Sequence, residues 1–339
     1  MLLERLVIDH FRNFKRLALD FDKRCTLIVG NNGSGKTSVL EAIYYAIVQR
    51  SFRTNTNHRL IQENQESFQI YMEFLVQEES HKLGLMRHRS QDSQMRLDGQ
   101  NHQGAAAIVA YLPCILLVPE SFKLLTEGSM LRRKWLDWGC CYEDPEYIQH
   151  WRRANALLNQ RNSALKAQAS KAHIQAWDQA YITAHETVLE HRRRYLETIT
   201  PQIANLICDF GLEYDIDLQC YGGWPAELSL AEALEQSLEK DRHFGFSQYG
   251  AHRMDVRIKK GTVLARESLS RGQQKLIICA MKLAQGLQLS QSHQRKVLFL
   301  LDDISAELDG RHFEKILAVL ERIQGQVIAT AIDASHYPS

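Results

Sequence analysis

Residues 30–37 combine glycines, a lysine and a threonine at a spacing that can bind a triphosphate. They read Gly-Asn-Asn-Gly-Ser-Gly-Lys-Thr and fill every fixed position of the pattern G-x-x-x-x-G-K-[ST]. The glycines let backbone N–H groups turn toward the phosphates, the lysine reaches the β- and γ-phosphates, and the hydroxyl holds Mg²⁺. The alternative is a glycine-rich turn without a ligand. We expect nucleoside triphosphate binding through Asn31, Asn32, Gly33, Ser34, Gly35, Lys36, Thr37 and Ser38.

Two neighbouring carboxylates, Asp302 and Asp303, follow the apolar residues 297–301. A buried strand that ends in an acid delivers the carboxylate to the edge of a parallel sheet, where it can share the metal of the phosphate-binding loop. We expect Asp302 and the Thr37 hydroxyl to hold Mg²⁺. Asp303 would orient the attacking water, with Lys36 as the second catalytic group at the γ-phosphate. The alternative is a pair of acids that only caps a loop.

A third motif, Leu269-Ser-Arg-Gly-Gln273, precedes a stretch with helical spacing. It resembles the Leu-Ser-Gly-Gly-Gln signature of the ABC ATPase superfamily, in which a serine and a helix N-terminus cradle the nucleotide of a partner subunit. Residues 305–309, Ser-Ala-Glu-Leu-Asp, resemble the D-loop of that superfamily, with Ser305 and Asp309 as its candidate site residues. Alone, residues 269–273 would more often be an ordinary helix cap, but their place between the other two motifs favours the signature. It would comprise Ser270, Arg271, Gly272 and Gln273.

The hydrophobic pattern predicts the elements that would position these residues. Residues 25–29, 297–301 and 326–330 read as buried strands, and 38–47 as the helix that follows the phosphate-binding loop. A strand, a glycine-rich loop and a helix in this order form the structural context that the loop requires.

Three regions of the chain differ in texture. Residues 1–118 show β-type alternation, residues 119–210 show long helical spacing, and strands and helices alternate in residues 211–339. Within the middle region we expect helices at 147–167 and 172–209. The prediction is an α/β fold, a P-loop NTPase head of ABC/SMC type formed by both ends of the chain, with an inserted helical lobe at 119–210.

Composition places few limits on function. The net charge is +1, from 41 basic and 40 acidic residues, so a nucleic-acid partner would have to meet a local basic patch. The seven cysteines form no C-x-x-C pair, which is typical of reduced thiols. The longest apolar run, residues 105–118, is too short to span a bilayer. We expect a cytoplasmic protein with no membrane partner.

The opening residues narrow the resemblance to one family. Residues 6–14, Leu-Val-Ile-Asp-His-Phe-Arg-Asn-Phe, resemble the start of the RecF family and of its SMC-type relatives. Further matches follow in order over nearly the whole chain: Ser51-Phe-Arg53, Leu97-Asp-Gly99, Pro119-Glu120, Arg132-Arg133, Leu136-Asp137, Gln160-Arg-Asn162, Gly250-Ala-His-Arg253 and Leu283-Ala-Gln285. The chain is identified as a member of the RecF family, which contains bacterial recombination mediators.

This resemblance implies a slow ATPase that uses Mg²⁺ and dimerises head to head on DNA when it binds ATP. It implies binding to double-stranded DNA and gapped junctions. It also implies cooperation with RecO and RecR, which loads RecA at single-strand gaps in DNA replication, DNA repair and the SOS response. For DNA contact we expect basic residues in local clusters, although such clusters are often solvated helix faces. The candidates are Arg53, Arg132, Arg133, Lys134, Arg192, Arg193 and Arg194.

Some positions depart from the superfamily pattern. Arg271 stands where transporters have glycine, and Asp303 is shorter than the usual glutamate; both choices resemble RecF. Residues 250–255 lack the proline and the first aspartate of the family's Gly-Pro-His-Arg-Asp-Asp. No glutamine marks a Q-loop near Pro119-Glu120. Asp333 and His336 both fit the switch position.

Other classes of protein share part of this pattern. An ATPase subunit of an ABC transporter-like or other SMC-like complex would carry the same loop, acids and signature. The opening residues 11–14 and the helical insertion argue against a transporter. The signature and D-loop argue against a small-molecule kinase, and the lack of long heptad arrays argues against a structural SMC head.

Overall fold

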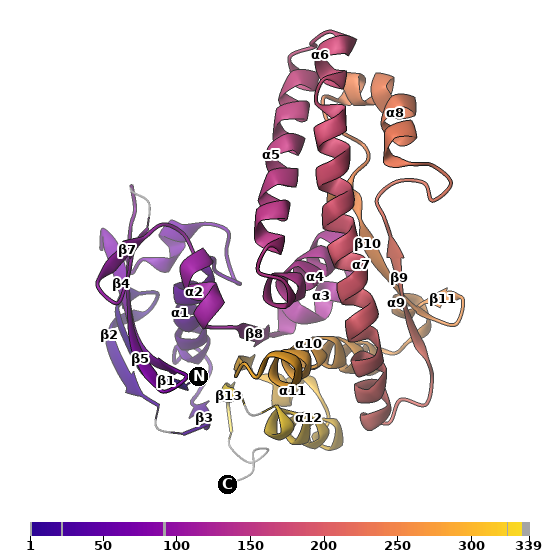
Figure 1. Ribbon diagram of the computed structural model, residues 1–339. Helices are drawn as coiled ribbons and strands as arrows, with labels where there is room; N and C mark the ends of the chain where they lie inside the picture. Colours follow the sequence, from indigo (N-terminus) through magenta and orange to yellow (C-terminus); the bar gives the residue numbers. More distant parts are fainter. Residues whose placement is uncertain (1, 22, 91–92, 324, 334–339) are drawn as a thin grey trace. The chain divides into compact units, whose positions relative to one another are not determined.

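The computed structural model describes residues 2–21, 23–90, 93–323 and 325–333 (Figure 1). This part of the chain divides into two compact units. The first contains Met1–Ser121 and Met281–Ser339, and the second contains Phe122–Ala280. The later boundary falls inside helix α10 (Arg271–His293).

This division differs from the predicted domain boundaries at one end. The first boundary lies near the expected position, but residues 211–280 group with the helical unit and not with the ATPase head. The reason is packing: strand β9 (Ile216–Tyr221) contacts helix α7 (Asp178–Asp209), and strand β10 (Asp255–Lys260) contacts helix α4 (Ser129–Glu143). Strands β9 and β10 therefore belong to a sheet of the second unit.

The first unit contains a four-stranded parallel sheet. Its strand order is β3 (Cys25–Val29), β13 (Gln326–Ala331), β12 (Leu298–Asp302) and β8 (Cys114–Leu117). The three predicted strands are confirmed, although β3 is half-exposed and only β12 and β13 are buried. The helix after the phosphate-binding loop, α1 (Lys36–Val48), is confirmed as well. Because the strands are parallel, their carboxyl ends meet at one edge of the sheet, where ligands of α/β proteins bind.

An antiparallel sheet completes the first unit, with the order β2-β1-β4-β5-β6-β7. The Asp98-Gly99 turn joins β6 to β7, and Asp98 has a positive φ of 52°. The core lies between this sheet, α1 and the parallel strands, and it includes Leu40, Phe68 and Leu300. The strands are β1 (Leu2–Phe11), β2 (Phe14–Asp20), β4 (Ser67–Val76), β5 (Glu79–His88), β6 (Gln94–Leu97) and β7 (Gln100–His102).

The remaining elements of the first unit are short or lie near its ends. They are η1 (Asn57–Leu60), α2 (Ala106–Tyr111), η2 (Pro119–Phe122), which ends at the boundary, α11 (Ile304–Glu307) and α12 (Gly310–Arg322). The long apolar run at 105–118 is thus helix α2 followed by strand β8. In the described part of the chain, no helix is long and apolar enough to cross a membrane.

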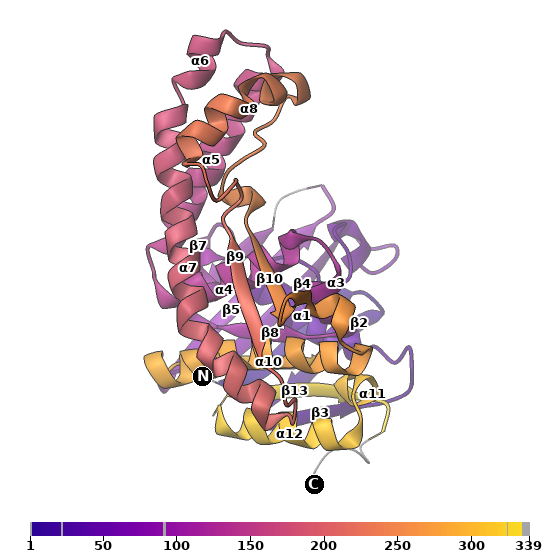
Figure 2. The ribbon, with the colours of Figure 1, turned by 90° about the vertical axis from the view of Figure 1, so that its right-hand side faces the viewer.

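Helices α5 (Tyr147–Lys166) and α7 run side by side in the second unit (Figures 1 and 2). The predicted helix at 172–209 is split, because α6 (Lys171–Gln175) ends before α7 begins. A small sheet with the order β11-β10-β9 accompanies these helices. The other elements are α3 (Lys123–Thr126), α8 (Leu230–Phe244), η3 (Ala251–Arg253), β11 (Val263–Leu264) and α9 (Ala265–Ser268).

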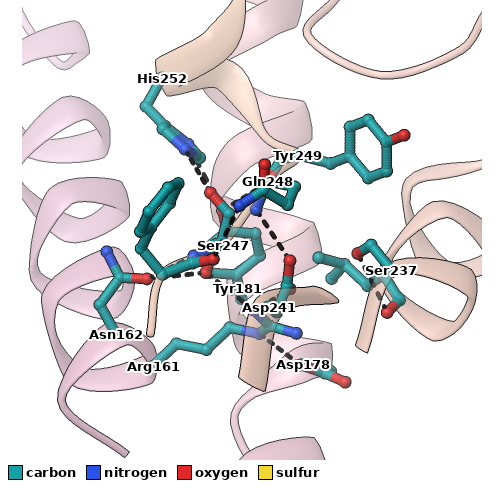
Figure 3. Close-up of polar contacts among 12 residues, drawn as sticks. Arg161, Asn162, Asp178, Tyr181, Ser237, Asp241, Ser247, Gln248, Tyr249 and His252 are labelled. Carbon is teal, nitrogen blue, oxygen red and sulfur yellow. Dashed lines mark hydrogen bonds and ion pairs between the residues drawn. The ribbon is translucent and has the colours of Figure 1, made fainter. Parts of the chain in front are cut away.

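A buried arginine joins the helices of the second unit (Figure 3). Arg161 of α5 donates from Nε to Asp178 at 2.9 Å and from Nη1 to Asp241 of α8 at 2.7 Å and Ser247 at 2.8 Å. Burial lowers the pKa of nearby His252 to about 4, so this ring is neutral at neutral pH. Ser247 also bonds to the Asn162 side chain, and its carbonyl oxygen lies 3.1 Å from Nε2 of His252. The motifs 160–162 and 250–253, noted in the sequence, therefore meet in one polar network.

Helix α8 was missed in the sequence, although its signals are present. Ser229 and Glu232 form a capping box at its start, with the Ser229 hydroxyl and the Glu232 carboxylate each bonded to the other's backbone N–H. Gly245 ends the helix in the left-handed conformation, at φ 73°.

Candidate nucleotide-binding site

The phosphate-binding loop lies between β3 and α1 in a conformation that needs its glycines. Gly33 and Gly35 have φ values of +82° and +100°, a region that residues with a side chain rarely adopt. A Cβ atom on Gly35 would lie 2.5 Å from Cζ of Phe14. Only glycine therefore fits at position 35, and the loop backbone stays close to the turn between β1 and β2.

Lys36 lies over this loop. Its Nζ donates to the carbonyl oxygens of Gly30 at 2.5 Å and Asn31 at 3.0 Å. These carbonyls hold the ammonium above the loop, where a phosphate oxygen would exchange with them as a partner.

The Thr37 hydroxyl and the Asp302 carboxylate meet at the carboxyl edge of the parallel sheet. Thr37 Oγ1 lies 2.9 and 3.0 Å from the two carboxylate oxygens, and Thr330 Oγ1 donates to Asp302 Oδ1 at 2.7 Å. Strand β13 lies between β3 and β12, which places Thr330 next to the acid. A hydroxyl and a carboxylate are the hard oxygen donors that Mg²⁺ prefers, so these residues fit that ion.

Asp303 is held by its backbone beside this pair. Its φ is +51°, and its N–H donates to the carbonyl and the hydroxyl of Thr330 at 3.2 and 3.1 Å. The left-handed conformation is one that aspartate and asparagine tolerate better than most residues. The neighbouring strand thus fixes the position of Asp303, and this residue lines the same cavity as Asp302.

A cavity of about 540 Å³ opens at this site. Most of the predicted nucleotide-binding residues line it, whereas Asn31 and Ser34 do not. Thr330 and a set of residues from outside the loop were not predicted to line the cavity. Asn13, Arg59 and Arg12 belong to this set, and the signal for Arg12 and Asn13 is the opening motif at residues 6–14. The lining includes Asn32, Gly33, Gly35, Lys36, Thr37, Ser38, Asp302 and Asp303.

Arg53, expected to contact DNA, lines the nucleotide cavity. Its Nη1 lies 3.5 Å from Oε2 of Glu41, a fully buried carboxylate on α1. Arg12, in the turn between β1 and β2, bonds to the same carboxylate. Arg53 therefore lies at the cavity of the phosphate-binding loop, a place that the sequence did not predict for it.

The signature segment begins helix α10 in the second unit. The Ser270 hydroxyl accepts from Gln273 N at 3.3 Å, and the Gln273 side chain accepts from Ser270 N at 3.1 Å. This is a reciprocal capping box, so the segment caps its helix whatever else it does. Ser270, Arg271 and Gly272 are exposed, and the proton of the Ser270 hydroxyl remains available to a further acceptor.

The D-loop candidates lie after β12. Ser305 belongs to α11 and is half-buried. Asp309 caps α12: its carboxylate accepts from His312 N at 3.1 Å and bonds to Nδ1 of that ring at 2.6 Å. These hydrogen bonds lower the pKa of Asp309 below its ordinary value.

The Q-loop and switch positions stay unassigned. Pro119 and Glu120 begin η2 at the carboxyl end of β8, where both are exposed. Asp333 follows β13, and His336 lies outside the described residues.

Two of the arginines expected to contact DNA are buried in the second unit. The Arg132 side chain is 8% exposed, and its nitrogens bond to Asp255 and to the carbonyls of Leu124 and Glu127. The Arg192 side chain is 4% exposed. It bonds to Asp137, to the Tyr147 hydroxyl and to the Ala251 carbonyl. Both side chains are almost wholly enclosed by protein as well as bonded, so neither is offered to a DNA phosphate at the surface, and these two predictions are corrected.

Other cations of the clusters are more accessible. Arg133 is half-buried and donates to the Met254 carbonyl at 2.7 Å. The helix cations, as we call the exposed members, are Lys134, Arg193 and Arg194.

A second cavity, of about 360 Å³, lies in the second unit beside β10, β11 and α9. Lys259 has no ion pair there among the described residues, and the one acid in the lining, Asp255, is paired with Arg132. Besides Arg132, three cations line it: Arg257 and Lys259 of β10, and Arg266 of the neighbouring helix α9. We call these three the strand cations.

Comparison with known proteins agrees with this architecture. Residues 2–338 match the family described as RecF/RecN/SMC N terminal domain. The chain is 36% identical to DNA replication and repair protein RecF of Shewanella baltica, over 98% of this chain and 92% of that protein. It is 35% identical, with the same coverage, to the protein of that name from Shewanella pealeana.

Solved structures show the same fold. A structure of the recombination mediator protein RecF with ATP, 23% identical, superposes with a TM-score of 0.87 and covers 98% of this chain and 92% of its own. A structure of an Smc head bound to the C-winged helix domain of ScpA, 15% identical, has a TM-score of 0.59 and covers 98% and 90%. The fold is that of an α/β ATPase head of ABC/SMC type. By its sequence and its fold, this chain belongs to the RecF family.

Proposed function

We propose that this protein is an ATP-dependent DNA-binding recombination mediator whose ATPase activity is slow. The observation that carries the nucleotide site is the Thr37–Asp302 contact, which brings together two motifs from distant parts of the chain inside one cavity. The RecF–ATP structure supports ATP as the ligand, since it shares this fold.

The residues of the site divide the chemistry between them. The loop backbone and Lys36 bind the phosphates, and Thr37 and Asp302 would hold Mg²⁺, which neutralises charge on the phosphates. Asp303 orients the attacking water and accepts its proton. An aspartate at this position reaches less far than a glutamate, which accords with slow turnover.

Two heads would close around two nucleotides. In this proposal the loop of one subunit and Ser270 of the other complete each site, with the Ser270 hydroxyl donating to the γ-phosphate. The capping box leaves that proton available. ATP then acts as a ligand that stabilises the dimer, and hydrolysis removes this stabilisation.

The names of the relatives support the proposed biological role. Their name, DNA replication and repair protein RecF, supports a role in DNA repair. The RecF protein whose structure was solved with ATP is a recombination mediator of the RecFOR pathway. We propose that this chain acts with RecO and RecR to promote RecA loading at single-strand gaps during repair and the SOS response, in the cytoplasm.

Asp303→Asn should bind ATP normally and hydrolyse it 10² to 10⁴ times more slowly, an estimate of about this order for loss of a general base. Asparagine tolerates the left-handed backbone at this position, so the Thr330 bonds should persist. Phosphate release and ATP affinity measure the two effects. Hydrolysis at the wild-type rate would remove Asp303 from the mechanism.

DNA contact is proposed to use the strand cations, of which Arg257 and Arg266 are exposed and Lys259 is half-buried, together with the exposed helix cations. Each phosphate of double-stranded DNA that a protein cation neutralises makes the slope of log K against log salt more negative by about 0.9. Changing the three strand cations together to glutamine should therefore make this slope less negative by roughly 2 to 3 units. The helix cations form a second triple variant, and Lys82→Gln, an exposed lysine of the first unit, serves as the control. Wild-type slopes in both triple variants would refute DNA binding through these cations.

A further inference from the structure

A buried carboxylate on α1 links two arginines that line the nucleotide cavity. Glu41 is fully buried, and its oxygens have partners on two sides. Arg12 donates to it from Nε at 2.8 Å and from Nη2 at 2.7 Å, a bidentate pair. The Ser51 hydroxyl donates to it at 2.5 Å, and Arg53 Nη1 lies 3.5 Å away. Glu41 itself does not line the cavity.

The Arg12 side of this arrangement is held rigidly. Arg12 has a positive φ of 54°, which is uncommon for a residue other than glycine and is kept only where the surroundings enforce it. Its N–H donates to the Leu60 carbonyl at 2.7 Å, and its Nη1 donates to the Arg59 carbonyl at 3.0 Å. Backbone and guanidinium are thus both fixed, and Glu41 supplies the charged partner.

The Arg53 side is held through the loop backbone. The Ser51 hydroxyl, bonded to Glu41, accepts from the N–H groups of Arg53 at 2.9 Å and Thr54 at 3.0 Å. The Arg53 side chain is 43% exposed and its ion pair with Glu41 is the longer one. Glu41 therefore fixes the start of this loop and leaves the Arg53 guanidinium able to turn toward a ligand.

The position of Arg12 indicates which part of the nucleotide it meets. Its neighbour Asn13 lies close to Gly35, since a Cβ on Gly35 would be 2.8 Å from the Asn13 amide nitrogen. The loop N–H groups at this point cradle the α- and β-phosphates, whereas Asp303 belongs to the γ-phosphate end. Contacts at the α- and β-phosphates are shared by ATP and ADP.

A buried ion pair adds little net stability, because desolvation of the charges offsets their attraction. The net stability of the fold is therefore weak evidence for the role of Glu41, which contacts two arginines of the cavity. We propose that Glu41 is a positioning residue for nucleotide binding: it holds Arg12, and through Ser51 the loop of Arg53, against the α- and β-phosphates. This inference rests on the proposed ATP site and adds a residue that does not touch the nucleotide.

Glu41→Gln should raise the dissociation constants of ATP and ADP by similar factors, each about tenfold, because the amide keeps the shape but loses the charge and one acceptor. Most of the loss in turnover should appear in KM and the smaller part in kcat, since the interaction is shared by ground state and transition state. Titration with both nucleotides and a thermal unfolding curve on the same sample measure this. Glu63→Gln, an exposed carboxylate of the first unit, is the matched control.

A double variant separates positioning from a general structural role. If Glu41 acts through Arg12 and Ser51, then Glu41→Gln in an Arg12→Met background should raise the dissociation constants by about threefold at most, the part that the Ser51 side carries. Ser51→Ala keeps the test independent of whether Glu41→Gln folds, since it leaves the Arg12 pair intact, and it should weaken both nucleotides about threefold by the loss of one hydrogen bond.

Unchanged affinity in the folded Glu41→Gln and Ser51→Ala variants, with only a lower melting temperature, would overturn the inference. So would a full additional loss in the double variant. Failure of the wild-type protein to bind ATP would instead refute the proposed function, which keeps the two failures distinct.

Discussion

Lys36→Ala should lose ATP binding by about two orders of magnitude, and with it ATP-dependent dimerisation. The ammonium lies over the loop, and charge-assisted hydrogen bonds to phosphate contribute about 1.5–3 kcal/mol each. Its partners in the structure are two loop carbonyls, which water can bond after the substitution, so the fold should survive. Nucleotide titration and light scattering measure the two losses.

Lys82→Ala provides the matched control, because this lysine is exposed on β5 and lies outside the cavity. It should bind ATP and dimerise as the wild type does. Normal ATP-driven dimer formation by Lys36→Ala would contradict the assignment of residues 30–37 as the nucleotide site.

Ser270→Arg should have the opposite profile: near-normal ATP binding by the monomer, with dimerisation and ATP-dependent DNA retention lost. Ser270 and its neighbours are exposed, so a long cation fits on the monomer surface. At a closed dimer it would occupy the place of the second phosphate cradle. Loss of the cap costs about 1 kcal/mol of stability, much less than the closure that is blocked. Binding and light scattering on one sample distinguish the two effects.

Ser268→Arg, two residues earlier and also exposed, is the control for added charge and bulk. A mixture of Ser270→Arg with Lys36→Ala can form one complete composite site per heterodimer at most, since each site takes its loop and its signature from different chains. Loss of ATP binding by the Ser270→Arg monomer, or normal dimerisation, would leave residues 269–273 as a helix cap alone.

The candidate nucleotide site was predictable because the sequence patterns that indicate it are local. The local sequence predicts the glycine loop, the strand at 25–29 and the strand at 297–301 with the acid after it. Parallel pairing then brings the carboxyl ends of the strands together. Thr330 could not be assigned, because its role depends on β13 lying between β3 and β12, a long-range pairing that no local pattern encodes.

The placement of the basic residues proposed to contact DNA was less predictable, for a related reason. Consecutive basic residues on a helix point in different directions, so the run 192–194 has one buried arginine and two exposed ones. Arg257 and Lys259 lie two residues apart on β10 and share one face of it, whereas Arg266 comes to the same cavity only through folding. The same holds for residues 211–280, whose strands join the helical unit by packing that local texture does not reveal.

ATP-dependent self-association with and without gapped DNA tests the central claim most directly. Sedimentation of the wild-type chain should show a monomer alone or with ADP, and a dimer with ATP and Mg²⁺ that gapped DNA stabilises further. Asp303→Asn should extend the lifetime of that dimer. A chain that stays monomeric with ATP, with or without DNA, would contradict the account of an ATP-gated dimer.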